Sequence, residues 1–145
     1  MIYEILTQHV EPEKRDEYIK VFGDILKQAN YAGSHDIKFF TSIEDPSRVI
    51  LMIAWDSVEA HTQHRGTPTH NAMREATARY QTQKSDGGHF VLHEVNRLNE
   101  FMPIDVIVMT TAEISNTMLR ESFMQRIANL TFMPDDRRNR YWVCQ

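Results

Sequence analysis

VILMIAWDSVEAHTQHRGTPTH, residues 49–70, is the segment that decides the fold, because its hydrophobic pattern changes halfway along. It opens with an unbroken apolar run, which predicts a strand over 48–55 that is buried on both faces. The strand ends in Trp55, and Asp56-Ser57 forms a polar turn after it. A change of pattern at such a turn predicts that a helix follows the strand directly.

Two short helices are expected after the turn. Ser57 is suited to cap a helix over 58–64, because its hydroxyl can accept a hydrogen bond from a free backbone N–H. A Gly-Thr-Pro break at 66–68 interrupts that helix, and a second one is expected over 69–80, where apolar side chains recur on one face. The two helices carry three histidines: His61, His64 and His70.

The chain before this segment predicts one helix between two strands. Residues 2–10 are rich in β-branched and aromatic side chains and indicate a strand. Pro12 suits the first turn of a helix, whose apolar side chains recur with a period of 3.6 as far as a break at 30–33. A strand over 36–42 is then expected to pair with the strand at 48–55 as a hairpin. The apolar face of the helix consists of Tyr18, Val21, Phe22, Ile25, Leu26 and Ala29.

A fourth strand over 89–95 completes the order β-α-β-β-α-β. This order is that of the ferredoxin-like fold, an α+β architecture with an antiparallel sheet and both helices on one face. The strand at 48–55 is apolar on both faces, so the face away from the helices also needs a cover. A second copy of the sheet is the simplest cover, and we therefore predict a homodimer packed sheet to sheet.

Residues 96–145 follow the domain at 1–95 as an extension. A strand over 104–114, a helix capped by Ser115 and a strand over 140–144 give this extension a β-α-β order. We expect it to pack on the domain or on the partner subunit.

Composition argues against several classes of partner. The net charge is −4 and no run of Lys and Arg exceeds two, so nucleic acid is not expected. No apolar run is long enough to cross a membrane, and the first residues lack the pattern of a signal peptide. The single Cys144 cannot form an intrachain disulfide, which fits a reducing cytoplasm.

Two motifs resemble the antibiotic biosynthesis monooxygenase family of the dimeric α/β-barrel superfamily. The first is VEPEK at 10–14, directly after the first strand. The second is WDSVEA at 55–60, with His64 nine residues after the tryptophan and His70 beyond Thr-Pro. The resemblance covers residues 1–95. It implies a homodimer whose paired sheets form a barrel-like core, with one pocket per subunit between sheet and helices.

The resemblance also implies a kind of chemistry. Several members oxidise polyphenols or quinols with molecular oxygen and without metal or flavin, so the expected partners are a small aromatic substrate and oxygen, with no cofactor. Electron-rich substrates can reduce oxygen once they are deprotonated, and the protein supplies a dry, oriented pocket. Other relatives degrade haem, cyclise polyketides or isomerise phosphorylated sugars. The fold alone therefore does not choose the reaction.

This chain departs from two subgroups of the family. Haem-degrading members have an asparagine on the first strand, where this chain has Leu6, Thr7 and Gln8. Quinone-forming oxygenases place an asparagine four residues before the tryptophan, where this chain has Leu51. The tryptophan and the histidines remain as the shared features.

His64 and His70 are the candidate catalytic residues, because a neutral imidazole can deprotonate a phenol near physiological pH. The candidate substrate-binding residues are Trp55, Leu51 and Tyr80. Trp55 can stack on a planar ring, and its indole N–H can bond a substrate oxygen. The alternative is structural: Trp55 and Tyr80 would then close the core, and His64 would bond a backbone carbonyl at the helix break.

Two other histidine arrangements give weaker evidence for a functional site. His61 and His64 lie three residues apart with His70 near, a spacing that can hold a metal, but no carboxylate or cysteine completes a ligand pattern, so no metal is expected. A further group could line the pocket, although a solvated polar strand face is the interpretation we favour. This group consists of His9, His89 and His93.

The sequence favours a small cofactor-independent monooxygenase acting on a phenolic, quinol or polyketide-like aromatic. Trp55 would wall the pocket, His64 or His70 would deprotonate or orient the substrate, and the deprotonated ring would transfer an electron to oxygen. Two alternatives stay open. One is a cyclase or isomerase that uses the same pocket without oxygen; the other is a non-catalytic ligand-binding or assembly dimer in which the histidines are structural.

Overall fold

The computed structural model describes residues 1–29, 31–91, 109 and 114–131. The chain divides into two compact units, Met1–Val91 and Leu92–Gln145. All the strands that the structure describes belong to the first unit, and the one helix described in the second is α4 (Thr117–Thr131). Among the described residues, no helix is long and apolar enough to cross a membrane.

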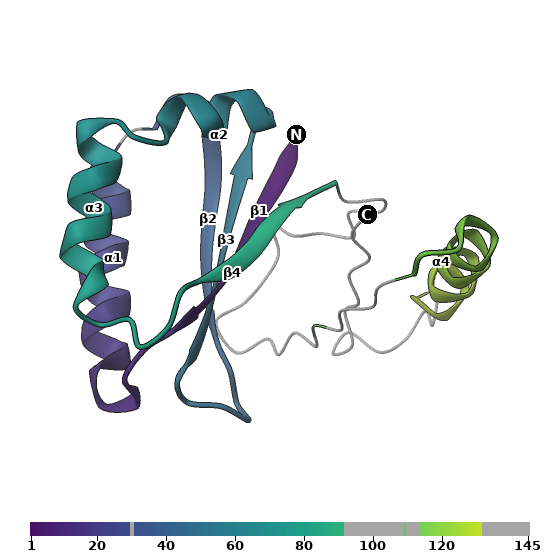
Figure 1. Ribbon diagram of the computed structural model, residues 1–145, viewed down its shortest axis with the longest axis horizontal. Coiled ribbons are helices and arrows are strands. Elements are labelled where there is room, and N and C mark those ends of the chain that lie inside the picture. Colours follow the sequence, from purple (N-terminus) through teal and green to yellow (C-terminus); the bar gives the residue numbers. More distant parts are fainter. Residues whose placement is uncertain (30, 92–108, 110–113, 132–145) are drawn as a thin grey trace. The chain divides into compact units, whose positions relative to one another are not determined.

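The first unit has the predicted ferredoxin-like order. Its four strands form one antiparallel sheet in the order β2-β3-β1-β4 (Figure 1). The strands are β1 (Ile2–His9), β2 (Ser34–Thr41), β3 (Arg48–Trp55) and β4 (Asp86–Phe90). The helices are the 3-10 turn η1 (Pro12–Lys14), α1 (Arg15–Gln28), α2 (Val58–His64) and α3 (Pro68–Ala78). The α+β class and the split β-α-β plan are therefore confirmed.

Capping hydrogen bonds, a glycine and a proline set the ends of α2 and α3. The Ser57 hydroxyl accepts a hydrogen bond from the Ala60 N–H at 3.2 Å, which confirms the predicted cap. Gly66 has a φ of +81°, a conformation that favours glycine and separates the two helices. The Thr67 hydroxyl then accepts from the His70 N–H at 3.2 Å, and Pro68 occupies the first turn of α3.

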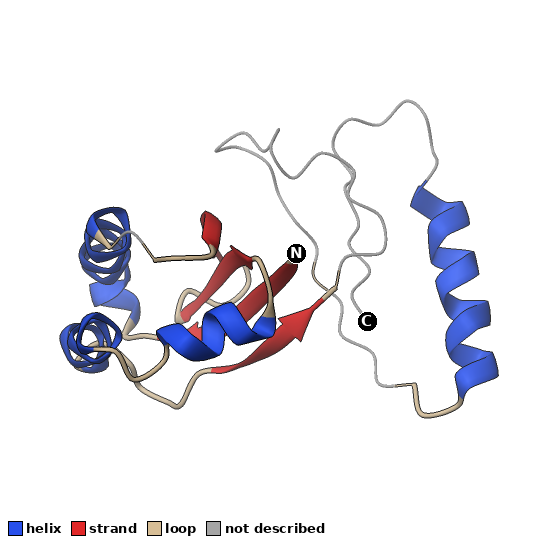
Figure 2. Ribbon diagram, turned by 90° about the horizontal axis from the view of Figure 1, so that it is seen from above, coloured by secondary structure: helices blue, strands red, loops and turns tan. Residues whose placement is uncertain are grey.

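The core lies between the sheet and its helices. Figures 1 and 2 show α1 and α3 side by side along one face, with α2 across the end of the sheet where Trp55 lies. Register fixes this face, because Ile2 pairs with Trp55 and Leu6 pairs with Leu51. The buried core consists of Val10, Tyr18, Phe22, Leu26, Tyr31, Val49, Leu51, Ile53, Trp55 and Tyr80.

The prediction for the fourth strand was wrong in its bounds. β4 begins at Asp86, not at residue 89, because Gly87 and Gly88 pair with β1 opposite Leu6 and Ile5. An Asp-Gly-Gly sequence is typical of turns, so the start of this strand was not predicted from the sequence. Here the glycine is needed, since a Cβ at Gly87 would collide with the backbone of β1. The predicted continuation to residue 95 lies outside the described residues.

In the second unit, the predicted helix is present as α4, but Ser115 does not cap it. The cap is Asn116, whose side-chain oxygen accepts a hydrogen bond from the Leu119 N–H at 3.2 Å. The strand predicted over 140–144 lies outside the described residues, as does nearly all of the one predicted over 104–114. The packing of residues 96–145 on the domain or on a partner stays a prediction.

Candidate functional site

Aromatic and imidazole rings gather around Trp55, the last residue of β3. The indole is 1% exposed, and its neighbours come from the chain after α1 and from α2. The Trp55 ring stacks on His61 (centroids 5.0 Å apart), on His64 (5.7 Å) and on Tyr31 (6.5 Å). We call the set of Trp55, Tyr31, His61, His64 and His70 the Trp55 cluster.

A buried carboxyl group holds the indole. Trp55 Nε1 donates a hydrogen bond to Oε2 of Glu4 at 3.1 Å, and Glu4 is 8% exposed on β1. Burial raises the pKa of Glu4, while the Trp55 hydrogen bond and the charge of Arg65 act in the opposite direction. A substrate oxygen would have to displace Glu4 to reach the indole N–H. That N–H role, considered from the sequence, does not match this geometry.

Sequence reasoning missed Glu4, although β1 contained a signal. On the strand face that carries Ile2 and Leu6, the residue between them is an acid. A charged residue on the apolar side of a strand is seldom buried without a partner. The partner could not be identified before the register placed residue 4 near the end of β3.

His61 touches Glu4 with one ring nitrogen and His89 with the other. His61 Nε2 lies 3.4 Å from Glu4 Oε1, and His61 Nδ1 lies 2.5 Å from His89 Nε2. His61 is 6% exposed. Burial lowers the pKa of His61 to about 4, with smaller contributions from the neighbouring positive charges of His89, Arg65, His64 and His70. His61 is therefore neutral at pH 7 and carries one ring N–H. We call these three residues the Glu4–His61–His89 row.

The interpretation of His89 as part of a solvated strand face was wrong. His89 pairs with Glu4 in the β1–β4 register, so its side chain lies on the helix-covered face and contacts His61. It is half-buried on β4. His9 is an odd-numbered residue of β1 and lies on the other face, whereas His93 lies outside the described residues.

His64 and His70 form the outer part of the cluster. Both side chains are half-buried, and their ring centroids lie 5.2 Å apart at nearly a right angle. His64 also lies against Tyr31, with centroids 3.9 Å apart. Burial is the main cause that lowers the pKa of each imidazole, so both are neutral at pH 7. The structure thus brings Trp55, His64 and His70 together.

The two histidines differ in their hydrogen bonds. His70 Nδ1 accepts a hydrogen bond from the Gly66 backbone N–H at 3.4 Å. In the part of the chain that the structure describes, the ring nitrogens of His64 have no hydrogen-bond partner, and the backbone-carbonyl bond considered from the sequence is not present. His64 is therefore the imidazole with both nitrogens available to a ligand.

Leu51 and Tyr80 lie away from the cluster. Leu51 is 1% exposed and pairs with Leu6 and Phe39 in the middle of the sheet. Tyr80 lies at the opposite end, where its carbonyl accepts a hydrogen bond from the Glu11 N–H at 3.2 Å. Its hydroxyl donates to Glu17 at 2.7 Å and accepts from Arg79. The structure does not bring Tyr80 to Trp55.

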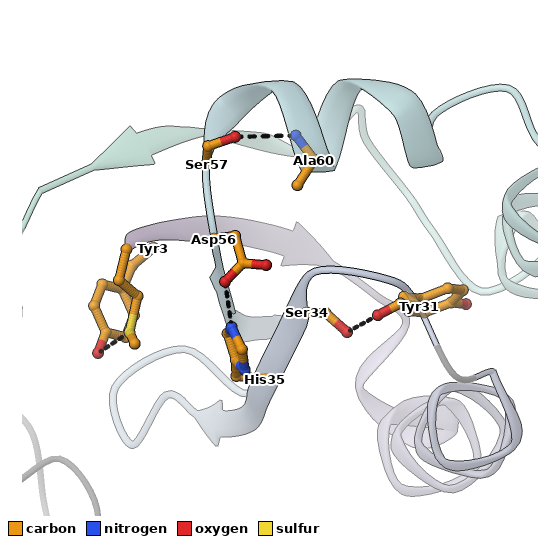
Figure 3. A network of polar contacts seen from close by, with 8 residues as sticks. Tyr3, Tyr31, Ser34, His35, Asp56, Ser57 and Ala60 are labelled. Carbon is orange, nitrogen blue, oxygen red and sulfur yellow. Dashed lines mark hydrogen bonds and ion pairs between the residues drawn. The ribbon is translucent and has the colours of Figure 1, made fainter.

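The turn after Trp55 is fixed on both sides (Figure 3). Asp56 Oδ1 lies 2.7 Å from His35 Nε2, and the Asp56 N–H donates to the Gly33 carbonyl at 2.8 Å. Gly33 has a φ of +81°, and a Cβ there would lie 2.9 Å from that of Ala60. The residue before β2 therefore packs closely against the first turn of α2. Among the described residues, no group of three or more His, Cys, Asp or Glu is arranged to hold a metal ion.

Part of the chain matches a known protein family. A family model described as antibiotic biosynthesis monooxygenase matches residues 1–76. The chain belongs to this family. The match takes in Glu4, Trp55, His61, His64 and His70, but ends before His89. No curated protein matches this chain.

Solved structures share the fold at low sequence identity. One, from Bordetella bronchiseptica, is a proposed antibiotic biosynthesis monooxygenase: it is 21% identical with a TM-score of 0.58, over 61% of this chain and 92% of its own. A second proposed member, from Caulobacter crescentus, is 23% identical with a TM-score of 0.55, over 61% and 85%. A point mutant of SnoaB, a cofactor-independent oxygenase from Streptomyces nogalater, is 10% identical with a TM-score of 0.54, over 66% and 95%.

Proposed function

We propose that this protein is a cofactor-independent monooxygenase that oxidises a phenolic, quinol or polyketide-like aromatic substrate with molecular oxygen. The observation that carries the proposal is the pair of half-buried, neutral imidazoles, His64 and His70, beside the rings of Trp55 and Tyr31. The imidazoles offer a proton acceptor to the hydroxyl of an aromatic ring, and the buried rings of Trp55 and Tyr31 pack behind them. Family membership and the oxygenase among its structural neighbours support the same reaction class.

The reaction needs no external reductant. His64 or His70 takes the hydroxyl proton, so that an O–H bond breaks and an N–H bond forms. The resulting anion transfers an electron to oxygen, and the two radicals combine at a ring carbon. One oxygen atom then becomes a carbonyl of the product and the other leaves as water, with both hydrogens supplied by the substrate. Trp55 supports the wall of the site, whereas the enclosed Leu51 and Tyr80 are left outside this proposal.

Oxygen uptake tests the proposal. Metal-stripped protein with a chelator present should consume oxygen with a panel of quinols and naphthols faster than buffer alone. His64→Ala should lower kcat/KM by about 100-fold, the usual contribution of a general base, and His70→Ala should also lower it. Activity that survives both substitutions would show that these histidines are not catalytic. Conversion of a substrate without oxygen uptake would favour the cyclase or isomerase, and neither conversion nor uptake would favour a ligand-binding or assembly dimer.

We also propose that two copies pair through the helix-free face of the sheet. That face carries Tyr3, Ile5 and Ile50, which are half-buried, and Met52 and Ala54, which are buried. Apolar side chains on a sheet face without helices favour packing against a second sheet. Light scattering should give twice 17.0 kDa, and Ile50→Lys should lower that mass. A wild-type mass of 17.0 kDa at micromolar concentration would refute the dimer. A cytoplasmic location is part of the proposal because the chain has one cysteine.

A further inference from the structure

No step of the proposed reaction uses the Glu4–His61–His89 row. We propose that His89 is a catalytic base of this site, and that His61 and Glu4 form a relay that receives the proton which His89 removes from the substrate. This inference rests on the proposed function for its substrate, a hydroxylated aromatic. In this assignment His89 takes over the proton removal that the proposed reaction gives to His64 or His70, and those two imidazoles orient the substrate.

The contacts of the row link the positions of its protons. His61 is neutral and has one N–H, which lies either on Nε2, 3.4 Å from Glu4 Oε1, or on Nδ1, which is hydrogen-bonded to His89. When Glu4 is ionised, the N–H of His61 faces the carboxylate. His61 Nδ1 then accepts from His89 Nε2–H, which leaves Nδ1 of His89 with a free lone pair. An ionised Glu4 thus makes the outer nitrogen of His89 a base.

One proton passes along the row without creating a charged imidazole. The substrate O–H bond breaks as His89 Nδ1–H forms. His89 Nε2–H passes its proton to His61 Nδ1, and His61 Nε2–H passes its proton to Glu4 Oε1. The substrate loses one proton, Glu4 gains one, and no electron moves. The 3.4 Å between His61 Nε2 and Glu4 Oε1 is long for transfer, so the relay requires this contact to shorten when a substrate is bound.

The surroundings favour a proton on Glu4 over a proton on His61. Burial raises the pKa of Glu4 and lowers that of His61, because both charged forms lose solvation. The titratable and charged groups that act on the row from α2, α3 and the chain between them are Arg65, His64 and His70. These groups disfavour a second positive charge at His61, so a relay of neutral imidazoles is the arrangement with the least electrostatic cost.

His89 is the member of the row that a substrate can reach. Glu4 and His61 are 8% and 6% exposed, whereas His89 is half-buried on β4, at the edge of the described sheet. Within the described residues, Nδ1 of His89 has no hydrogen-bond partner. His61 links this nitrogen to the Trp55 cluster, because the His61 ring stacks on the indole.

NMR of protein with ¹⁵N-labelled histidine rings tests the relay without any substrate. Protonated and unprotonated ring nitrogens resonate apart, and the spectrum of His89→Gln identifies the signals of His89. As the pH rises, ionisation of Glu4 should move the N–H of both rings from Nδ1 to Nε2. In Glu4→Gln both rings should keep Nδ1–H at every pH. In this variant the Trp55 N–H donates to the oxygen of the new side-chain amide, so the amide NH₂ must face His61. The NH₂ then donates to Nε2 of His61, which keeps the N–H of His61 on Nδ1. Identical tautomers in wild type and Glu4→Gln would overturn the relay.

Oxygen uptake tests the role of His89. His89→Gln should lower kcat/KM by about 100-fold, and Glu4→Gln should remove the rise in activity that accompanies ionisation of Glu4. Lys20→Gln, which removes a surface ion pair with Asp24 on α1, is the control and should leave activity unchanged. If uptake occurs and His89→Gln retains it, His89 is not the base, and the inference fails while the function stands. If the wild type consumes no oxygen, the function fails, and the tautomers alone decide the relay. If Glu4→Gln does not fold, His89→Gln still decides the claim.

Discussion

Acid should weaken the fold through His61, because that imidazole binds a proton less readily in the folded protein than in the unfolded chain. Its pKa falls from 6.5 to about 4 on folding, mainly through burial. A depressed pKa means that the unfolded state takes up a proton first as the pH drops. The free energy of unfolding should therefore decrease from about pH 6.5 downward, until the folded form is also protonated near pH 4.

The size of the effect follows from the same values. Between pH 6.5 and pH 5 the unfolded imidazole is mostly protonated and the folded one is not. Each pH unit then costs about 1.4 kcal/mol, which gives about 2 kcal/mol at pH 5. Residual contact with water reduces this to about 1 to 2 kcal/mol. Glu4 acts in the opposite direction, since its raised pKa favours the folded state as the pH falls. The wild-type pH profile alone would therefore mix the two effects.

A comparison with His61→Gln separates them. Urea unfolding at fixed protein concentration should show wild type more stable at pH 7, with the gap narrowing by about 1 to 2 kcal/mol at pH 5. Ile37→Val, which removes a methylene group from beside the core and no titratable group, should have the same effect at both pH values. A wild-type advantage that stays constant or grows toward pH 5 would refute the argument that burial keeps His61 neutral.

Three substitutions test the structural contacts that support the site. Trp55→Phe should lower the free energy of unfolding by about 2 kcal/mol in urea titrations, because buried Glu4 loses its donor. Gly87→Ala should cost about 1 to 3 kcal/mol through collision with β1, whereas Gly88→Ala, whose Cβ meets only the Phe90 ring at 3.9 Å, should cost less; equal effects would contradict this. Ser57→Ala should cost about 1 kcal/mol through loss of the α2 cap, with Thr62→Ala in the same helix as control in thermal melts.

The element order could be predicted from the sequence because it depends on local signals. The apolar run before Trp55, the cap at Ser57 and the glycine at residue 66 each act within a few residues, and the structure has a strand, a helix start and a break at these positions. The family motif at residues 55–60 indicated the same fold class. β4 escaped prediction because its first residues are Asp-Gly-Gly, which local propensity assigns to a turn. Only the close approach of β1 explains why glycines form a strand there.

The site could be predicted only where its residues share one segment. Trp55 and His64 are close in sequence, and the structure brings them together as predicted. Glu4 and His89 join them only through two strand pairings, β1 with β3 and β1 with β4. A shift of one residue in either register would turn the side chain to the other face. The sequence does not fix that register, so a buried acid on β1 and a histidine on β4 gave no sign that they meet at His61.

The polarity of the row argues for a role beyond packing. Trp55 could be held at the end of β3 by apolar neighbours, as Leu51 and Ile53 are held in the same strand. A buried carboxyl group and imidazole lose solvation, and their mutual contacts only partly offset that cost. Apolar residues of similar size are often at least as stable in such positions. Glu4 and His61 therefore close the core at a higher cost in free energy than apolar residues would. Apolar residues could not transfer a proton to or from His89, and this is the property that Glu4 and His61 add.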